Sequence, residues 1–450
     1  MRWHMNLRVA LLWTVAMLVS SVATAAAYRW EEITLPVASG ATCGNGTPYR
    51  FYVNRAPAPN DRNLLIAYEF GGACTDYGSC TGEGGAISAK NPDGIPAGYL
   101  WSIPSQGWVN QIASPVMSAI TGNIPWLAGS SDGKLPPTAN WTKVFLPYCT
   151  GDVHAGSAIR SYVSADGAHT LLQHFAGLAN TRAALAWMNS NGLGKPDRML
   201  AWGLSAGGYG AMANYAFLRS ALQPQQSALL DDGGPLFPVN LDGDGSDSYA
   251  YRMYSVAFRD WGMLESDGLL DRLRRDTPVG GSNANLRALG QLYGALAHAF
   301  PQDRFGLSDT LHDATIARFS YAGRYPEVDA LPTTQRDAAR MAMFEHDNQA
   351  LITALRGRAP NLGYFFPWDH YGIASNHTAT AVTFLGTEID NTGINVGAFV
   401  TDLVSGDDPA QRPVMQMAAT QPPPPSLAAA IAEQIQSIVQ IVREFVGASS

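Results

Sequence analysis

The chain has 450 residues, 46% of them hydrophobic and 15% charged, which supplies one large apolar core or at most two ordinary ones and excludes a protein that is disordered throughout. The formal net charge is -8 and the 29 Lys and Arg residues form no basic cluster, so the positive footprint of a nucleic-acid-binding protein is missing. We therefore expect no nucleic-acid partner, and no polyanionic substrate that is held by charge alone.

The first 27 residues have the layout of a secretory signal peptide. Arg2 and Arg8 precede the apolar run 9–22, and small residues follow through Ala27. Cleavage after Ala25 or Ala27 would suit this layout, so we expect a secreted or periplasmic protein. The alternative is an uncleaved anchor, but the run is shorter than the roughly 20 residues that a spanning helix needs. No later segment is long and apolar enough, so no stable membrane span is expected.

Short apolar runs bounded by Gly, Pro or Asp alternate with helical stretches after this leader. The runs predicted to be buried parallel strands are residues 63–70, 143–148, 198–202, 227–231, 304–308 and 362–366. Residues 170–188 and 208–222 have apolar spacing near 3.6 and are predicted helices. The alternation predicts an α/β protein with a mostly parallel, doubly wound sheet and helices on both faces, in one catalytic domain over residues 28–420.

Four cysteines, an even number in a chain that is expected to be exported, predict two disulfides: Cys43, Cys74, Cys80 and Cys149. Three pairings are open, one of which closes a small loop from Cys74 to Cys80 and joins Cys43 to Cys149. A zinc site is the alternative, but the spacings match no common finger and no His accompanies them. We expect no metal and no cofactor.

The C-terminal segment 421–450 contains a proline run, and a helix is predicted after it. The prolines at 422–425 predict a stiff, extended linker. Apolar residues at steps of three or four then predict one stripe on a helix: Leu427, Ile431, Ile435, Ile438, Val442 and Phe445. Packing on the catalytic domain, self-association and a surface contact all remain open for this stripe.

The strongest chemical signal is the sequence G-L-S-A-G at residues 203–207, between a predicted strand and a predicted helix. It fits the G-x-S-x-G elbow of α/β-hydrolases, in which flanking positions have no room for side chains and the serine is exposed. The motif predicts an α/β-hydrolase fold with Ser205 as the nucleophile.

A serine nucleophile needs a histidine base and a carboxylate that orients it, in the chain order serine, acid, histidine. The histidines beyond Ser205 are His298, His312, His346, His370 and His377. His377 follows the last predicted strand on a Gly- and Asn-containing loop and is the predicted base, with His370 as its rival on that loop.

The acid is predicted to be Asp313, because it follows the apolar run 304–308 at the carboxyl end of a strand. The carboxylates that remain open beside it are Asp232, Asp309, Asp329 and Asp347. The oxyanion of the attacked carbonyl needs backbone N–H donors. Ala206 supplies one, and the turn at 71–74 after the strand ending at Phe70 is expected to supply another.

Four segments in order resemble the pectinacetylesterase family, which also contains the animal Notum carboxylesterases. They are E-F-G-G-A-C-T-D-Y-G-S-C at 69–80, L-P-Y-C-T-G-D-V-H-A-G at 146–156, G-L-S-A-G-G at 203–208 and S-N-H-T at 375–378. The resemblance spans residues 30–406, interrupted by divergent stretches. It implies Ser205, Asp313 and His377 as the triad and Gly72 and Ala73 as oxyanion donors. Many members carry a nearby Trp that this chain lacks.

The resemblance implies a secreted, bacterial-type serine carboxylesterase that acts on carboxylic esters, with acetyl esters on a polysaccharide as the first expectation. A lipase or polyester depolymerase of the same fold is the alternative, and a catalytically silent polymer-binding protein is the hypothesis from another class. Asp152 and His154 are expected to be structural. Residues 242–247 (D-G-D-G-S-D) are expected to be a polar loop, because the distal Glu of a calcium loop is missing.

Overall fold

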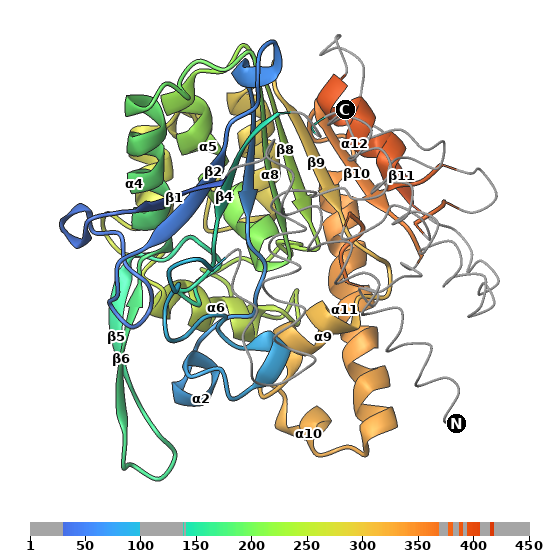
Figure 1. The fold of residues 1–450 in the computed structure, drawn as a ribbon. Coiled ribbons are helices and arrows are strands. Elements are labelled where there is room, and N and C mark those ends of the chain that lie inside the picture. Colours follow the sequence, from blue (N-terminus) through green and yellow to red (C-terminus); the bar gives the residue numbers. More distant parts are fainter. Residues whose placement is uncertain are drawn as a thin grey trace, which may run out of the picture.

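The computed structural model describes residues 30–99, 138, 141–368, 377–380, 387–389, 394–405 and 415–417 (Figure 1). The predicted signal peptide, the linker and helix at 421–450, and His370 lie outside the described residues. Within the described ranges, no helix has the length and apolarity to cross a membrane.

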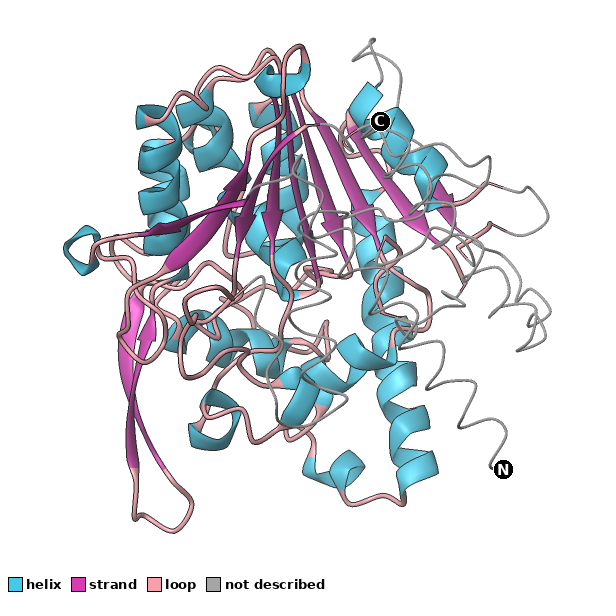
Figure 2. Cartoon of the chain, viewed as in Figure 1, coloured by secondary structure: helices cyan, strands magenta, loops and turns pink. Residues whose placement is uncertain are grey.

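A large sheet runs through the molecule (Figure 2). Its nine described strands have the order β1-β2-β4-β3-β7-β8-β9-β10-β11. β1 pairs antiparallel with β2, and β2 antiparallel with β4, whereas every later pairing is parallel. This is the strand order of an α/β-hydrolase and agrees with the predicted fold class. The strands are β1 (Trp30–Thr34), β2 (Arg50–Asn54), β3 (Asn63–Tyr68), β4 (Thr142–Leu146), β7 (Arg198–Leu204), β8 (Gln226–Asp232), β9 (Arg304–Ser308), β10 (Leu362–Phe366) and β11 (Met415–Met417).

The sheet contains all six predicted strands, and β9 and β10 have the predicted bounds. The helix predicted over 170–188 is wrong in its first part. Thr170–Phe175 is strand β6, which pairs antiparallel with β5 (Ala158–Val163), and helix α4 begins only at Gly177. The β5–β6 hairpin extends away from the body of the molecule (Figure 1). Gly177, the first residue of the helix, is the local sign of the boundary that the apolar spacing obscured.

Helices cover both faces of the sheet, as predicted. Phe305 and Gly306 are consecutive on β9, so their side-chain positions point to opposite faces. The Phe305 ring contacts Tyr215 of α5 (Ala206–Leu222), with ring centroids 5.0 Å apart. A Cβ added at Gly306 would lie 2.9 Å from Phe399 of α12 (Val396–Ser405), so α12 lies on the other face.

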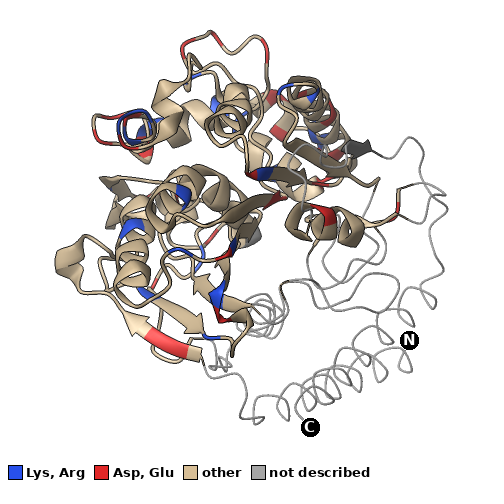
Figure 3. Ribbon diagram, turned by 90° about the horizontal axis from the view of Figure 1, so that it is seen from above, with Lys and Arg blue, Asp and Glu red and all other residues tan. Residues whose placement is uncertain are grey.

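The remaining helices pack around these layers. The α-helices are α2 (Tyr77–Cys80), α4 (Gly177–Ser190), α6 (Tyr251–Asp260), α7 (Leu269–Asp276), α8 (Leu292–Ala299), α9 (Ala314–Tyr321), α10 (Pro326–Asp329) and α11 (Thr333–Leu355). The 3-10 helices are η1 (Val37–Ser39), η2 (Asn60–Arg62), η3 (Gly85–Ile87), η4 (Pro278–Gly281) and η5 (Leu289–Gln291). Basic and acidic residues are interspersed along the described ribbon (Figure 3).

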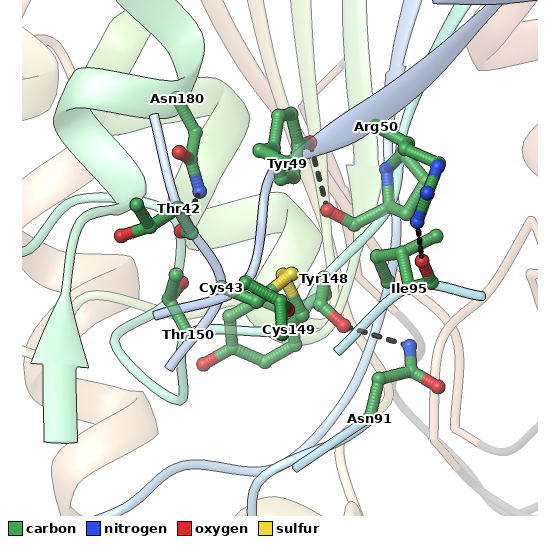
Figure 4. The surroundings of a disulfide bond; sticks show 12 residues. Thr42, Cys43, Tyr49, Arg50, Asn91, Ile95, Tyr148, Cys149, Thr150 and Asn180 are labelled. Carbon is green, nitrogen blue, oxygen red and sulfur yellow. Dashed lines mark hydrogen bonds between the residues drawn. A yellow bond between two sulfur atoms is a disulfide. The ribbon is translucent and has the colours of Figure 1, made fainter. Parts of the chain in front are cut away.

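Two disulfides form, as predicted, and they settle the pairing: Cys43 with Cys149, and Cys74 with Cys80. Hydrogen bonds surround the first of them (Figure 4). Tyr49 Oη donates to the Pro147 carbonyl over 2.8 Å, and Asn180 Nδ2 donates to the Thr42 carbonyl over 2.9 Å. The Cys43–Cys149 bond therefore ties the segment between β1 and β2 to the segment that follows β4.

The two disulfides should stabilise the protein unequally. Cys43 and Cys149 are 106 residues apart in sequence, whereas Cys74 and Cys80 are 6 apart, so the first constrains the unfolded chain far more. We expect the double variant Cys43→Ser/Cys149→Ser to lose about 2–5 kcal/mol of unfolding free energy. Cys74→Ser/Cys80→Ser should lose less. Denaturant titration of both variants measures this, and an equal or reversed order would contradict it.

Candidate active site

Ser205 lies on a sharp turn between β7 and α5, with φ 55° and ψ -122°. Such a backbone conformation costs a non-glycine residue about 1–3 kcal/mol and persists only where its surroundings enforce it. The glycines on either side allow the turn. A Cβ added at Gly203 would lie 2.0 Å from the Gly207 carbonyl oxygen, and one at Gly207 would lie 2.2 Å from the Tyr68 carbonyl oxygen. The absence of side chains at both positions is thus a steric requirement, as the motif predicts.

His377 and Asp313 form a hydrogen-bonded pair. His377 Nδ1 and Asp313 Oδ2 are 2.5 Å apart, and the Asp313 side chain is fully buried. Asp313 is the N-cap of α9, where its other oxygen, Oδ1, accepts the Ile316 N–H over 2.8 Å. The carboxylate is thus fixed at a helix end while it orients the imidazole.

The second ring nitrogen of His377 has a different environment. Nε2 is buried and has no hydrogen-bond partner among the described residues. Because Nδ1 faces a carboxylate, the neutral ring carries its proton on Nδ1 and leaves Nε2 as an acceptor. Burial lowers the pKa of His377, but the charge of Asp313 and the hydrogen bond to it outweigh burial and raise that pKa above its ordinary value of 6.5.

Two consecutive glycines after β8 connect this pair to Ser205. A Cβ added at Gly233 would lie 3.4 Å from Cε1 of His377, and a Cβ at Gly234 would lie 2.8 Å from the carbonyl oxygen of Ser205. Ser205 and His377 therefore flank the same short turn. Their segments leave the carboxyl ends of parallel strands, the edge of an α/β sheet at which ligands bind.

A small pocket opens beside Ser205. Its free volume is about 20 Å³, enough for roughly one water-sized group. Its wall contains Ser205, Ala206, the consecutive glycines Gly71 and Gly72, and mostly apolar side chains: Ile87, Val153, Tyr209, Thr315, Ile316 and Phe319.

The predicted oxyanion donors differ in where they lie. Gly72 and Ala206 line the pocket, and Ala206 is the first residue of α5, where backbone N–H groups have no acceptor within the helix. The Ala73 N–H instead donates to the Ile87 carbonyl over 2.9 Å, and Ala73 does not line the pocket. The geometry therefore favours Gly72 and Ala206 over Ala73 as the proposed donors.

The other carboxylates that the sequence left open form contacts of their own. Asp329 pairs with Arg340, and Asp347 accepts the Tyr249 and Ala250 N–H groups. Asp309 is buried directly after β9, and burial together with the neighbouring Asp313 charge raises its pKa well above the ordinary range. Asp232 bonds to the main chain after His377 and not to its ring.

The remaining described histidines are engaged elsewhere. His298 bonds to the Gly294 carbonyl, and His312 packs on Trp368. His346 contacts the adjacent Asp347 on α11, but its side chain is 55% exposed. His377 is the histidine that the described structure places against both a buried aspartate and the segment beside Ser205.

His154 is buried, as expected for a structural residue. Burial lowers its pKa to about 4, so the ring is neutral and its Nε2–H donates to the Glu69 carbonyl over 2.8 Å. Tyr68 and Tyr148 pack against the ring. His154 therefore supports the end of β3 that leads into the oxyanion loop.

Glu69 was not recognised from the sequence. Its buried carboxylate accepts from Lys90 Nζ, Tyr99 Oη and the Tyr148 N–H, each over 2.8 Å, directly before the loop of Gly72. The available signal was a charged residue at the end of an otherwise apolar run.

Among the described residues, no group of three His, Cys, Asp or Glu side chains could hold a metal ion. Asp242 of the polar loop pairs with Arg287 over 2.5 Å.

The chain is similar to known proteins in sequence and in fold. Residues 120–255 match the family model described as pectinacetylesterase. Two solved structures of similar fold are crystal forms of the Wnt deacylase Notum from Drosophila. One is 17% identical, with a TM-score of 0.53 and coverage of 87% of this chain and 96% of that chain. The other is 16% identical, with a TM-score of 0.52 and coverage of 87% and 97%. No curated protein matches the sequence. The predicted α/β-hydrolase fold and the resemblance to the family are confirmed.

The coupling of His377 to Asp313 should be visible in its titration. We expect an NMR titration of the imidazole to give a pKa above 6.5, and Asp313→Asn to lower it, because the charge is lost while burial still disfavours the imidazolium. Asp329→Asn, which disturbs only the contact to Arg340 and the Gly323 N–H, should leave the titration unchanged. An unchanged pKa in Asp313→Asn would contradict the pairing.

Proposed function

We propose that this chain, a carboxylic ester hydrolase related to the pectinacetylesterase family, is a secreted serine esterase that removes small acyl groups through Ser205, His377 and Asp313. The observation that carries the proposal is the His377 ring, which holds Asp313 through Nδ1 and presents a partnerless Nε2 beside the turn of Ser205. The substrate we favour is an acetylated polysaccharide.

In the first half-reaction, Ser205 Oγ attacks the ester carbonyl and His377 Nε2 takes its proton. The buried Asp313 carboxylate stabilises the imidazolium that forms. The N–H groups of Ala206 and Gly72 receive the oxyanion, and the positive end of α5 adds to this stabilisation. The imidazolium then gives its proton to the leaving alcohol, and an acyl-serine remains.

In the second half-reaction, a water molecule attacks the acyl-serine and His377 takes the proton of that water. The resulting tetrahedral intermediate collapses, the proton returns to Ser205 Oγ, and the carboxylic acid leaves. The neutral form of His377 starts both halves, so activity should rise with pH through an ionisation above 6.5, the direction in which Asp313 shifts the pKa.

The size of the pocket supports a short acyl group. About 20 Å³ beside Ser205 accommodates a methyl-sized group rather than a long chain. The description of the matched family, pectinacetylesterase, points to the same acyl group. The neighbour of similar fold, a Wnt deacylase, also removes an acyl group, which supports the reaction class and not the chain length.

Export is supported by two features. The protein has two disulfides, and disulfides persist in oxidising compartments. The first 27 residues have the layout of a signal peptide. A catalytically silent polymer-binding protein would keep the fold without needing a buried aspartate against a histidine, so the geometry favours the enzyme.

Loss of the triad members should be severe and not additive. Ser205→Ala and His377→Ala should each lower kcat for acetyl esters by about 10⁶-fold, and the double variant should be little worse, because nucleophile and base act as a unit. Asp313→Asn should lower kcat by about 10⁴-fold. Asp329→Asn is the control that should keep most activity. Full activity of Ser205→Ala on every ester would refute the proposal, and an inactive His370→Ala beside an active His377→Ala would move the base to His370.

The acyl preference can be tested with nitrophenyl esters of increasing chain length. We expect kcat/KM to fall by about 10-fold or more from acetate to octanoate, because the pocket excludes the longer chain. Phe319→Ala should reduce this ratio by widening the pocket. Phe300→Ala, which removes a buried ring outside the pocket, should leave the ratio unchanged. A wild-type preference for octanoate would favour the lipase or depolymerase reading.

A further inference from the structure

We infer that Asp232 is a positioning residue that holds Ser205 and the His377 segment in one arrangement. The inference rests on the proposed function and extends it to a residue outside the triad. Asp232 is the last residue of β8 and is fully buried. β8 lies between β7, which leads to Ser205, and β9, which leads to Asp313. Its position alone places it between two of the three segments that must cooperate.

The carboxylate of Asp232 binds the main chain that follows the base. Oδ1 accepts the Ala379 N–H over 2.8 Å, and Oδ2 accepts the Thr380 N–H over 2.7 Å. Two hydroxyls complete the set, since Ser308 Oγ donates to Oδ1 over 2.8 Å and Thr380 Oγ1 donates to Oδ2 over 2.5 Å. Four donors to one buried carboxylate fix the segment that carries His377 against the end of β8.

The main chain of Asp232 binds the nucleophile. The Ser205 N–H donates to the Asp232 carbonyl over 2.7 Å. Ser308, whose hydroxyl donates to the Asp232 carboxylate, is the last residue of β9. The turn that carries Asp313 follows it. Asp232 therefore contacts Ser205 directly. It contacts the segment of His377 through Ala379 and Thr380, and the segment of Asp313 through Ser308.

The His377 segment needs such a support. Thr378 has φ 74°, a left-handed conformation that a β-branched residue adopts only when its surroundings enforce it. Gly233, with φ 67°, leaves space beneath it, because an added Cβ would lie 2.7 Å from Cγ2 of Thr378. The bonds of Asp232 to Ala379 and Thr380 hold the chain on the far side of this strained residue.

Asp232 does not act as the triad acid, since Nδ1 of His377 is bound to Asp313. Asp231 and Asp309 are buried near Asp232; burial raises the pKa of both, and the Asp232 charge adds to that rise. Burial raises the pKa of Asp232, and its four donors oppose that rise. The Asp232 charge also raises the pKa of His377, after the larger effects of burial and Asp313.

The decisive variant is Asp232→Asn. Each carboxylate oxygen receives a backbone N–H, so either orientation of the amide sets its NH₂ against one of these donors. We expect kcat for acetyl esters to fall about 10²-fold, as for a misplacement of about 1 Å, with KM changed less than threefold. The apparent pKa of the kcat/KM profile should fall, because a charge that favours the imidazolium is lost. An unchanged kcat and profile would overturn the inference.

Asp347→Asn is the matched control. Asp347 is equally buried and also accepts two backbone N–H groups and a hydroxyl, those of Tyr249, Ala250 and Tyr321. It should lose thermal stability as Asp232→Asn does, yet keep the kcat and the pH profile of the wild type. Equal losses of kcat in both variants would show a merely structural role for Asp232. If Asp232→Asn does not fold, Thr380→Val decides, because it removes one donor: a several-fold drop in kcat supports the inference and an unchanged kcat overturns it.

A fluorophosphonate probe separates the two levels of the proposal. The wild-type protein should be labelled at Ser205, and Asp232→Asn should be labelled about 10²-fold more slowly. No labelling of the wild type would refute the serine esterase itself. Equal labelling rates in the two proteins would refute only the role of Asp232.

Discussion

The left-handed backbone of Ser205 is the constraint on which the rest of the site depends. A residue in this conformation needs neighbours that leave it no alternative, and the chain provides them at very short range. Gly203 and Gly207 are so close to other main-chain atoms that no Cβ fits, and the Asp232 carbonyl accepts the Ser205 N–H. The parallel pairing of β7 with β3 and β8 keeps these contacts in register. The conformation of Ser205, the proposed nucleophile, therefore depends on contacts with the sheet beneath it.

Several buried carboxyl groups lie near Ser205 and His377 and influence the electrostatics of the site. Asp232, Asp309 and Asp313 lie at or just after the ends of the neighbouring strands β8 and β9, and burial together with the Asp313 charge raises the pKa of Asp309. A raised pKa favours the neutral form of Asp309, which reduces the negative charge next to Asp313. The Asp313 carboxyl group lies against His377, where the proposed mechanism forms an imidazolium.

The sequence predicted those parts of the molecule that depend on local chemistry. Continuous apolar runs identified β9 and β10 with their bounds, and the G-x-S-x-G spacing identified the turn of Ser205 because its steric demand is contained in five residues. Asp313 was predicted from its place after a strand, and it lies against His377. Tertiary contacts decided the rest. Residues 170–175 form a strand because β5 pairs with them, and the Ala73 N–H donates to the Ile87 carbonyl of another turn. The sequence of residues 226–232 does not predict that Asp232 bonds to Ala379 and Thr380, almost 150 positions later. That contact exists only once the sheet has formed.

The order of the first four strands has a consequence for how the chain reaches its native state. β2 pairs with β4 and not with β3, so the β1–β2 hairpin, complete by Asn54, has no partner on its inner edge until Thr142–Leu146 is available. Until then that edge carries unpaired N–H and C=O groups, which other chains can extend into an intermolecular sheet. Such long-range pairing slows folding, because the entropy of a long loop is lost before its contacts form. If the chain enters an oxidising compartment N-terminus first, this edge of the β1–β2 hairpin stays unpaired while some ninety further residues are delivered. The yield of folded protein would then depend on assisted folding rather than on the stability of the native state.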